Sequence, residues 1–284
     1  MNGSKERKGF WLGFPGIFWL TIFFMLPLLF VLFASFLTKG VGGAAILPWT
    51  FEHYERTFGT FGIVVWRSLR IALYTTFWCF LLGYPLAFFI ATRKSSRTRL
   101  LLLFLILLPF WTNFLVRTYA LKSIIGPDGL VNSALMSLSF VSQPLEMLFT
   151  PFAVILGLVY GFLPFMVLPV YAAVERLDFR FIEAANDLGA NDWHTFWRVI
   201  FPLTLPGVVA GSMLVFIPAI GSFVTPDLLG GTRGLMIGNL IARQFGGRGD
   251  IPLGSAVSIV LIVLVLIGVV IYIRFGQDEV SERG

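Results

Sequence analysis

The residue types that enzymes use for catalysis are scarce in this sequence. It contains two histidines, His53 and His194, and one cysteine, Cys79, and none of them belongs to an H-E-x-x-H motif or another catalytic spacing. Its 29 glycines include no G-x-x-x-x-G-K-[ST] motif, the loop that cradles nucleotide phosphates. We therefore expect a chain that is not an enzyme and holds no cofactor, so any energy from ATP must come from another polypeptide.

One polar segment, Glu175–Gly207, has a pattern that could dock a partner protein. Near its start, apolar residues recur at the i, i+3, i+4 and i+7 spacing of one helix face, and these are Phe181, Ala184, Ala185 and Leu188. Gly189 follows, and glycine suits the left-handed conformation in which helices often end. Because two adjacent alanines let another backbone approach closely, the spacing predicts a short helix that presents a docking face.

A second short helix is predicted directly after Gly189. Asp192 is its expected N-cap, and Pro202 and Pro206 are expected to end it near the membrane. Its apolar residues again keep helical spacing, and they are Trp193, Phe196, Trp197 and Ile200. The alternative for this helix is an interfacial position on lipid, with the two tryptophans as anchors.

The composition of the whole chain is that of a membrane protein. Of the 284 residues, 57% are hydrophobic and 13% charged, against about 45–50% and about 25% in a soluble domain. A soluble chain of this size could not bury so much apolar surface. The net charge of +6 comes from Lys and Arg in short loops, as the positive-inside rule requires, and not from a basic stripe of the kind that binds nucleic acid.

Six transmembrane helices are predicted, because each needs about 20 apolar residues between charges. They are Gly9–Thr38, Ile71–Thr92, Leu100–Val116, Met147–Val174, Val199–Thr225 and Ile251–Ile273. We expect the third to continue to about Leu121, which places Arg117 near its outer end. The loop Arg93–Arg99 has four positive charges and no acid, so we expect it, and both chain termini, on the cytoplasmic side.

The polar segment also carries a recognisable motif. It reads Glu183-Ala184-Ala185, three residues, Gly189, nine residues, and Val199-Ile200-Phe201-Pro202. This resembles the EAA motif of ABC-importer permeases, whose pattern ends in Ile-x-Leu-Pro, with apolar Val199 and Phe201 at its two apolar positions. The resemblance implies an all-α polytopic membrane protein with the type I (MetI-like) importer permease fold. It also implies that Glu183, Ala184, Ala185 and Gly189 couple the chain to a separate ATPase, as a helix seated in a groove of that subunit.

Four further segments resemble the spermidine/putrescine permeases of the PotB and PotH type, and they are Pro109–Ala120, Phe149–Tyr171, Phe201–Gly231 and Met236–Ile241. The resemblance implies a polyamine importer of the bacterial inner membrane. Its partners would be an ATPase dimer that binds ATP and Mg, a second homologous permease and an external solute-binding protein. The permease core would span residues 63–275, with coupling helices at about 180–200, after a tail, first helix and outer loop (1–62) and before a cytoplasmic tail (276–284).

The substrate path follows from the resemblance and not from a motif. A polyamine would be held by carboxylates and by aromatic faces, yet the six predicted spans contain no Asp or Glu. The candidates are Trp111, Asn113, Tyr119, Tyr160 and Asp227. The competing explanations are packing or an interfacial belt for the aromatic residues, and helix capping or pairing with Arg233 for Asp227. A second permease would supply the missing carboxylates. The alternatives for function are an importer permease for another amine or an oxyanion, and a secondary transporter, which would need ionisable residues at membrane depth.

Overall fold

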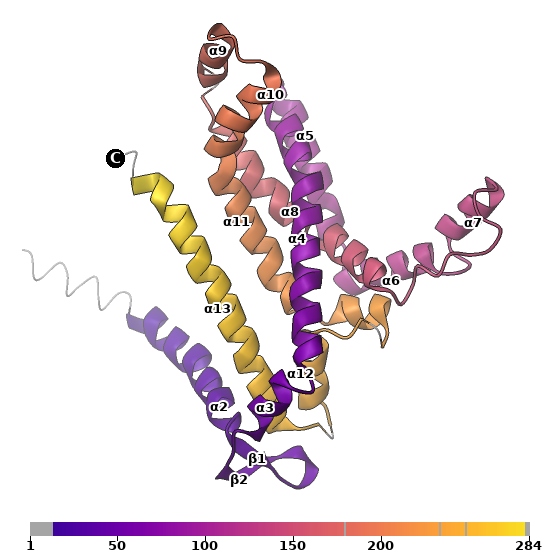
Figure 1. Ribbon diagram of the computed structural model, residues 1–284, viewed down its shortest axis with the longest axis vertical. Coiled ribbons are helices and arrows are strands. Elements are labelled where there is room, and N and C mark those ends of the chain that lie inside the picture. The colour runs from indigo at the N-terminus through magenta and orange to yellow at the C-terminus, as the bar shows by residue number, and fades with distance from the viewer. Residues whose placement is uncertain (1–13, 179, 233, 248, 282–284) are drawn as a thin grey trace, which may run out of the picture. The chain divides into compact units, whose positions relative to one another are not determined.

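A computed structural model of the chain describes residues 14–281 except 179, 233 and 248, with side chains described up to residue 270 (Figure 1). The described chain is helical apart from one two-stranded sheet. Its contacts divide it into two units. One takes the chain up to Gly62 together with Leu240–Val263, and the other takes Ile63–Asn239 and the chain from Leu264 onward.

The first unit begins with a helix over Phe14–Ala34 and continues into a small hairpin. Its elements are η1 (Thr21–Met25), α2 (Leu26–Ala34), β1 (Leu37–Lys39), η2 (Val41–Gly43), β2 (Ala45–Trp49) and α3 (Glu52–Phe58). The predicted first span, Gly9–Thr38, is too long at its end, because Leu37 already pairs with Trp49 in the antiparallel sheet. Ser35 stops the helix: its hydroxyl donates to the carbonyl of Leu32 (2.6 Å) and is bonded to the hydroxyl of Tyr54 (2.8 Å). Residues 9–13 of that prediction lie outside the described part of the chain.

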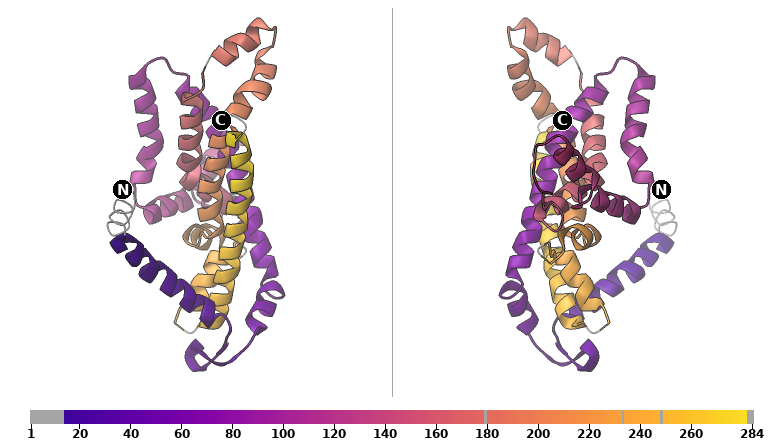
Figure 2. Two further views of the ribbon diagram at one scale, coloured as in Figure 1. Left: turned by 90° about the vertical axis from the view of Figure 1, so that its left-hand side faces the viewer. Right: turned by 90° about the vertical axis from the view of Figure 1, so that its right-hand side faces the viewer.

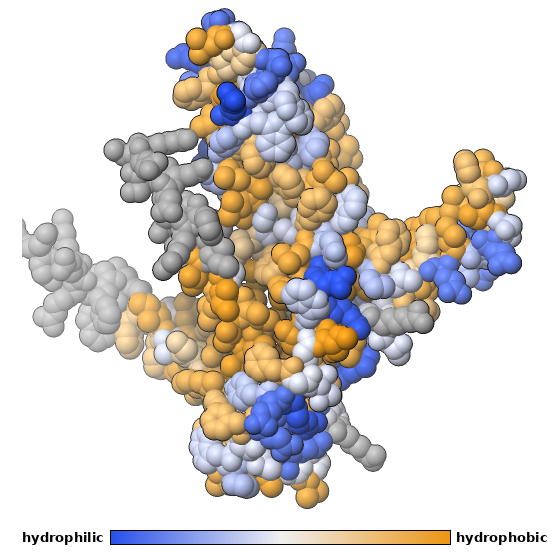
Figure 3. Space-filling model, viewed as in Figure 1, coloured by the Kyte–Doolittle hydropathy of each residue, from blue (hydrophilic) through white to orange (hydrophobic). Residues whose placement is uncertain are grey.

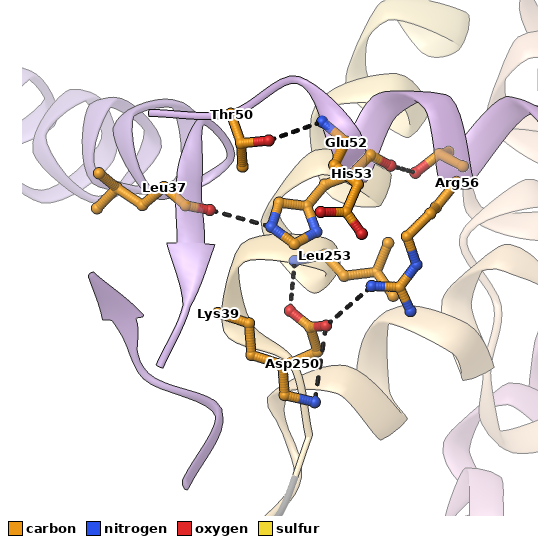
Figure 4. Close-up of polar contacts among 9 residues, drawn as sticks. Leu37, Lys39, Thr50, Glu52, His53, Arg56, Asp250 and Leu253 are labelled. Carbon is orange, nitrogen blue, oxygen red and sulfur yellow. Dashed lines mark hydrogen bonds and ion pairs between the residues drawn. The ribbon is translucent and has the colours of Figure 1, made fainter. Parts of the chain in front are cut away.

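A buried carboxylate organises the polar end of this unit (Figure 4). Asp250 is 3% exposed, and its Oδ1 accepts a hydrogen bond from the backbone N–H of Leu253 (3.1 Å), which caps the start of α13 (Ile251–Ser281). Its Oδ2 lies 3.4 Å from Nη1 of Arg56 on α3 and 3.7 Å from Nζ of Lys39 on β1. The two cations compensate the buried charge and connect the hairpin and α3 to the start of α13.

The second unit holds the remaining helices. They are α4 (Gly62–Ala91), α5 (Ser96–Leu107), η3 (Leu108–Trp111), α6 (Phe114–Ile125), α7 (Leu130–Ser137), α8 (Pro151–Glu175), α9 (Arg180–Asp187), α10 (Asp192–Thr195), η4 (Phe196–Ile200), α11 (Phe201–Ile220) and η5 (Pro226–Gly230). The boundary between the two units at Leu240 falls within α12 (Ile237–Phe245). The core of the second unit lies where α8 packs against α4 and α11, around Met166, Val167 and Val170, all fully buried. Figures 1 and 2 show α9 and α10 beyond the ends of α8 and α11, at one end of the unit.

Glycines let α11 approach α8 closely. A Cβ added at Gly207 would lie 2.5 Å from Cβ of Ala173 and 2.7 Å from the carbonyl oxygen of Pro169, and one at Gly211 would lie 2.9 Å from Sδ of Met166. The two glycines are four residues apart, so both lie on the helix face that meets α8. Small residues at this spacing are typical of membrane helices that pack backbone to backbone.

Five helices in the described chain are long and apolar enough to cross a membrane, or six when one bent pair counts as a single span. The polytopic all-α architecture expected from the sequence is therefore confirmed. Large apolar side chains on α4, including Phe77 and Leu81, are exposed, as expected for a lipid-facing surface. In the space-filling view, apolar residues cover much of the face shown, and hydrophilic residues gather near α9 and α10 and near α3 (Figure 3).

The prediction that the third span continues unbroken to about Leu121 is wrong. The helix Ser96–Trp111 ends, and the chain resumes as Phe114–Ser137 after a bend of 91°. Pro109 cannot donate a backbone hydrogen bond, Thr112 has an extended backbone, and the side chain of Asn113 caps α6 by accepting from the N–H of Leu115 (2.8 Å). The hydropathy of the segment is that of a membrane span, but Pro109 and the capping side chain of Asn113 interrupt the helix.

Candidate functional site

The candidate coupling loop, Glu183–Gly189, lies on α9 and the turn that follows it. α9 covers Arg180–Asp187, so the predicted short helix is confirmed. Gly189 has φ +80°, the left-handed conformation expected of a helix stop. The side chains of Phe181 and Leu188 are 56% and 89% exposed, so the apolar face of the helix is not covered by the described part of this chain.

The second short helix is present but differs from the prediction at both ends. Its N-cap is Asn191, whose Oδ1 accepts from the N–H of His194 (2.9 Å), and Asp192 is the first helical residue. Pro202 and Pro206 do not end it, because the helix runs without a break from Asp192 to Ile220. Pro202 lies inside this continuous helix, directly after the π-helical turn η4, and local π-helical adjustments let membrane helices accommodate a proline that lacks an N–H.

Polar contacts anchor both ends of this loop region to the membrane helices. Where α8 ends, Oε1 of Glu175 accepts from the hydroxyl of Tyr171 (2.7 Å) and from Nη1 of Arg99 on α5 (3.0 Å). Where α11 begins, the buried hydroxyl of Thr204 is 2.8 Å from that of Tyr84 on α4. The contact with Arg99 also places the basic loop Arg93–Arg99 at the same end of the unit as α9.

The bend between η3 and α6 opens a cavity of about 580 Å³. Its lining comes from η3, α6, α8 and α11 and includes Phe110, Thr112, Phe114, Arg117, Gly161, Phe162, Phe165, Met213, Leu214, Ile217 and Pro218. Most of these side chains are apolar, and among the described residues that line the cavity Arg117 carries the one formal charge.

Arg117 is held at the broken helix and does not lie near the outer end of a continuous span. Its Nη1 donates to the carbonyl oxygen of Pro109 (3.1 Å). Its guanidinium carbon lies 5.5 Å from the ring centroid of Tyr160, 5.6 Å from that of Phe114 and 5.9 Å from that of Phe110, within the range of cation–π attraction. The position of this cation in an apolar segment was the sequence signal for the site, but the ring of Tyr160 comes from α8 and is not a local neighbour.

The structure does not gather the five predicted substrate-path residues into one lining. Tyr160 faces Arg117, whereas the 78%-exposed Trp111 lies edge-on to Phe104. Asn113 is the cap of α6, and Tyr119 is an exposed residue of that helix. Asp227 lies in η5, and Arg233, its proposed partner, is outside the described residues. The cavity is instead lined by the sequence neighbours of Trp111, Asn113 and Tyr160.

Comparison with known proteins identifies the architecture. The family model described as "Binding-protein-dependent transport system inner membrane component" matches residues 83–277. The spermidine/putrescine transport system permease protein PotB of Haemophilus influenzae is 46% identical over 260 residues, which are 91% of each chain. In solved structures, a chain of a bacterial ABC transporter involved in the import of the acidic polysaccharide alginate superposes with a TM-score of 0.77 at 19% identity, covering 97% of this chain and 98% of that one. The same importer bound to its alginate-loaded periplasmic protein gives 0.73 at 19% identity, over 98% of both chains.

Proposed function

This chain belongs to the family of binding-protein-dependent transport system inner membrane components, and from that premise we propose that it is the permease subunit of an ATP-driven polyamine importer. The observation that carries the substrate class is the 46% identity to a spermidine/putrescine permease over 91% of the chain. Family membership and the membrane-length helices make it a multi-pass inner membrane protein and a transport subunit. ATP and Mg are then bound by the partner ATPase.

Glu183–Gly189 is the element that we propose to enter the ATPase. α9 lies beyond the ends of α8 and α11, and its apolar face is exposed, which suits a helix that inserts into a groove. Glu183, Ala184, Ala185 and Gly189 would form this contact. The partners would be an ATPase dimer, a second homologous permease and an external binding protein that delivers the polyamine.

We assign the end of the second unit that holds α9 to the cytoplasmic side of the membrane. The basic loop Arg93–Arg99 and α9 lie together there through the Arg99–Glu175 ion pair, and the positive-inside rule favours cytoplasm for such a loop. We therefore place the coupling loop in the cytoplasm and, with the bent pair counted as one of six spans, both chain termini as well.

Transport requires two arrangements of the helices around the cavity, one open to each side. ATP binding would close the ATPase dimer, and the coupling loop would transmit that motion to α8 and α11, between which it lies in the chain. Loaded binding protein and ATP shift the equilibrium only through their different affinities for the two arrangements.

The test is ATP hydrolysis by the complete importer in liposomes, with the binding protein empty or loaded with spermidine or putrescine. We expect polyamine-loaded protein to raise hydrolysis, and Glu183→Ala to remove the rise without preventing membrane insertion. Asp192→Ala is the matched control, because it removes an exposed acid on α10, outside Glu183–Gly189. A response to another amine or an oxyanion, but not to polyamine, would refute the substrate class, and uptake driven by a proton gradient without ATP would refute the importer.

A further inference from the structure

We propose that the cavity at the bend between η3 and α6 contains a binding site for an alkylammonium group, and that the guanidinium of Arg117 occupies this site until substrate displaces it. The choice of an alkylammonium ligand rests on the proposed polyamine function, whereas the site itself rests on the geometry at the bend. Arg117 is then a tethered competitor of the substrate.

The bend offers a cation two kinds of attraction at once. The first comes from the C-terminal end of η3, where the carbonyl oxygen of Pro109 accepts from the Thr112 hydroxyl (2.7 Å) as well as from Arg117. Carbonyls at a helix C-terminus carry the negative end of the helix dipole, and broken membrane helices use such ends to hold cations. The second comes from the rings of Phe110, Phe114 and Tyr160, which all lie within 6 Å of the guanidinium carbon.

Arg117 and a substrate ammonium group cannot use this place together. Both are cations, and in a cavity lined mainly by apolar side chains their repulsion is weakly screened. Among the described residues that line the cavity, no Asp or Glu is present to offset two positive charges. The site therefore accepts one cation at a time, and substrate binds when the flexible arginine side chain moves aside.

Such an exchange leaves one cation in contact with the Pro109 carbonyl and the rings. A polyamine ammonium that replaces a guanidinium takes over its carbonyl and ring contacts, so the step needs no carboxylate within the span. This accounts for a cation path whose predicted membrane segments contain no acidic residue. The cavity of about 580 Å³ lies within the range of small-ligand sites.

Two substitutions separate the effect of the charge of Arg117 from the effect of its hydrogen bond. Arg117→Gln keeps a side-chain N–H that can donate to the Pro109 carbonyl but removes the charge, and Arg117→Lys keeps the charge. Lys122→Ala is the matched control, because Lys122 is a cation on the same helix whose ring contact is with Phe149, 5.6 Å away, and it is not among the described residues that line the cavity.

The measurement is equilibrium binding of radiolabelled spermidine to the complete importer in nanodiscs, without binding protein. If arginine holds the site about nine-tenths of the time, Arg117→Gln raises the affinity about tenfold, whereas Arg117→Lys and Lys122→Ala leave it near wild type. Adding Tyr160→Ala to Arg117→Gln removes the gain, but adding Tyr160→Phe retains it because the ring face remains. Methylguanidinium should compete with spermidine more strongly in Arg117→Gln than in wild type.

An affinity of Arg117→Gln equal to or below wild type, in a complex with the wild-type melting temperature, overturns the proposal. If the Arg117→Gln complex does not assemble, the test is whether methylguanidinium competes with spermidine for the wild-type complex. A lack of competition there also overturns the proposal. The proposed function fails separately, when polyamine-loaded binding protein does not stimulate ATP hydrolysis by the wild-type importer.

Discussion

Replacing Gly207 by alanine should loosen the contact between α8 and α11. The added Cβ would lie 2.5 Å from Cβ of Ala173 and 2.7 Å from the carbonyl oxygen of Pro169, both far inside ordinary van der Waals contact. Because the second of these atoms belongs to the backbone, no side-chain rotation relieves it. The two helices must separate by about 1 Å, and overpacking of this kind costs about 1–3 kcal/mol.

The assay is thermal unfolding of the purified permease, in which a chain of this size loses about 2–4 °C for each kcal/mol. We expect Gly211→Ala to cost less than Gly207→Ala, because its nearest contact, at 2.9 Å, is the thioether of Met166 and its nearest backbone contact, the Met166 carbonyl oxygen, is at 3.1 Å instead of 2.7 Å. Gly16→Ala is the matched control: Gly16 is also helical but has no atom within 4 Å of the added Cβ. Gly207→Ala unfolding at or above the wild-type temperature would refute the proposed close packing.

Three further changes test other parts of the structure. Gly189→Val places a β-branched residue at φ +80°, at a cost of about 1–2 kcal/mol, and should abolish the stimulation of ATP hydrolysis by loaded binding protein while membrane insertion, measured by fractionation, persists. Asn191→Ala removes the cap of α10 and should lower the melting temperature by an amount corresponding to about 1 kcal/mol; an equal effect of Asp192→Ala would contradict the assignment of the cap. Asp250→Ala should also cost about 1 kcal/mol in the same assay, mainly through its lost cap, because its two basic partners are 40% and 47% exposed and return to water; no loss would contradict the role of this carboxylate.

The sequence predicted the features that depend on near neighbours. The i, i+4 pattern of α9 and the glycine after it are local signals, and the structure has both. Asn191 and Asp192 are both good N-caps, so residue type could not choose between them; the extended backbone at Asn191 decides. Proline usually ends a helix, and the π-helical turn that accommodates Pro202 within the helix has no sequence signature of its own.

The misplaced Arg117 has a different cause. Hydropathy predicts a continuous helix across Pro109, because proline is common in membrane helices. Asn113 is a residue type that often caps a helix start, and it indicates the break. The environment of the guanidinium depends on Tyr160, which lies 43 positions further along the chain, and single-sequence periodicity carries no record of such contacts. For the same reason the sequence does not show that Gly207 and Gly211 meet α8.

The unbroken run from Asp192 to Ile220 has a mechanical consequence. Its 29 residues extend about 43 Å at 1.5 Å per residue, with no linker between the part next to the proposed coupling loop and the apolar part of membrane-spanning length. A tilt of about 10° in a rod of that length swings its far end by about 7 Å. The helix bends most readily at the π-helical turn η4, directly after α10, and at the prolines at 206 and 218, so a displacement of α10 reaches the far end of α11 less the part taken up by bending at these three points.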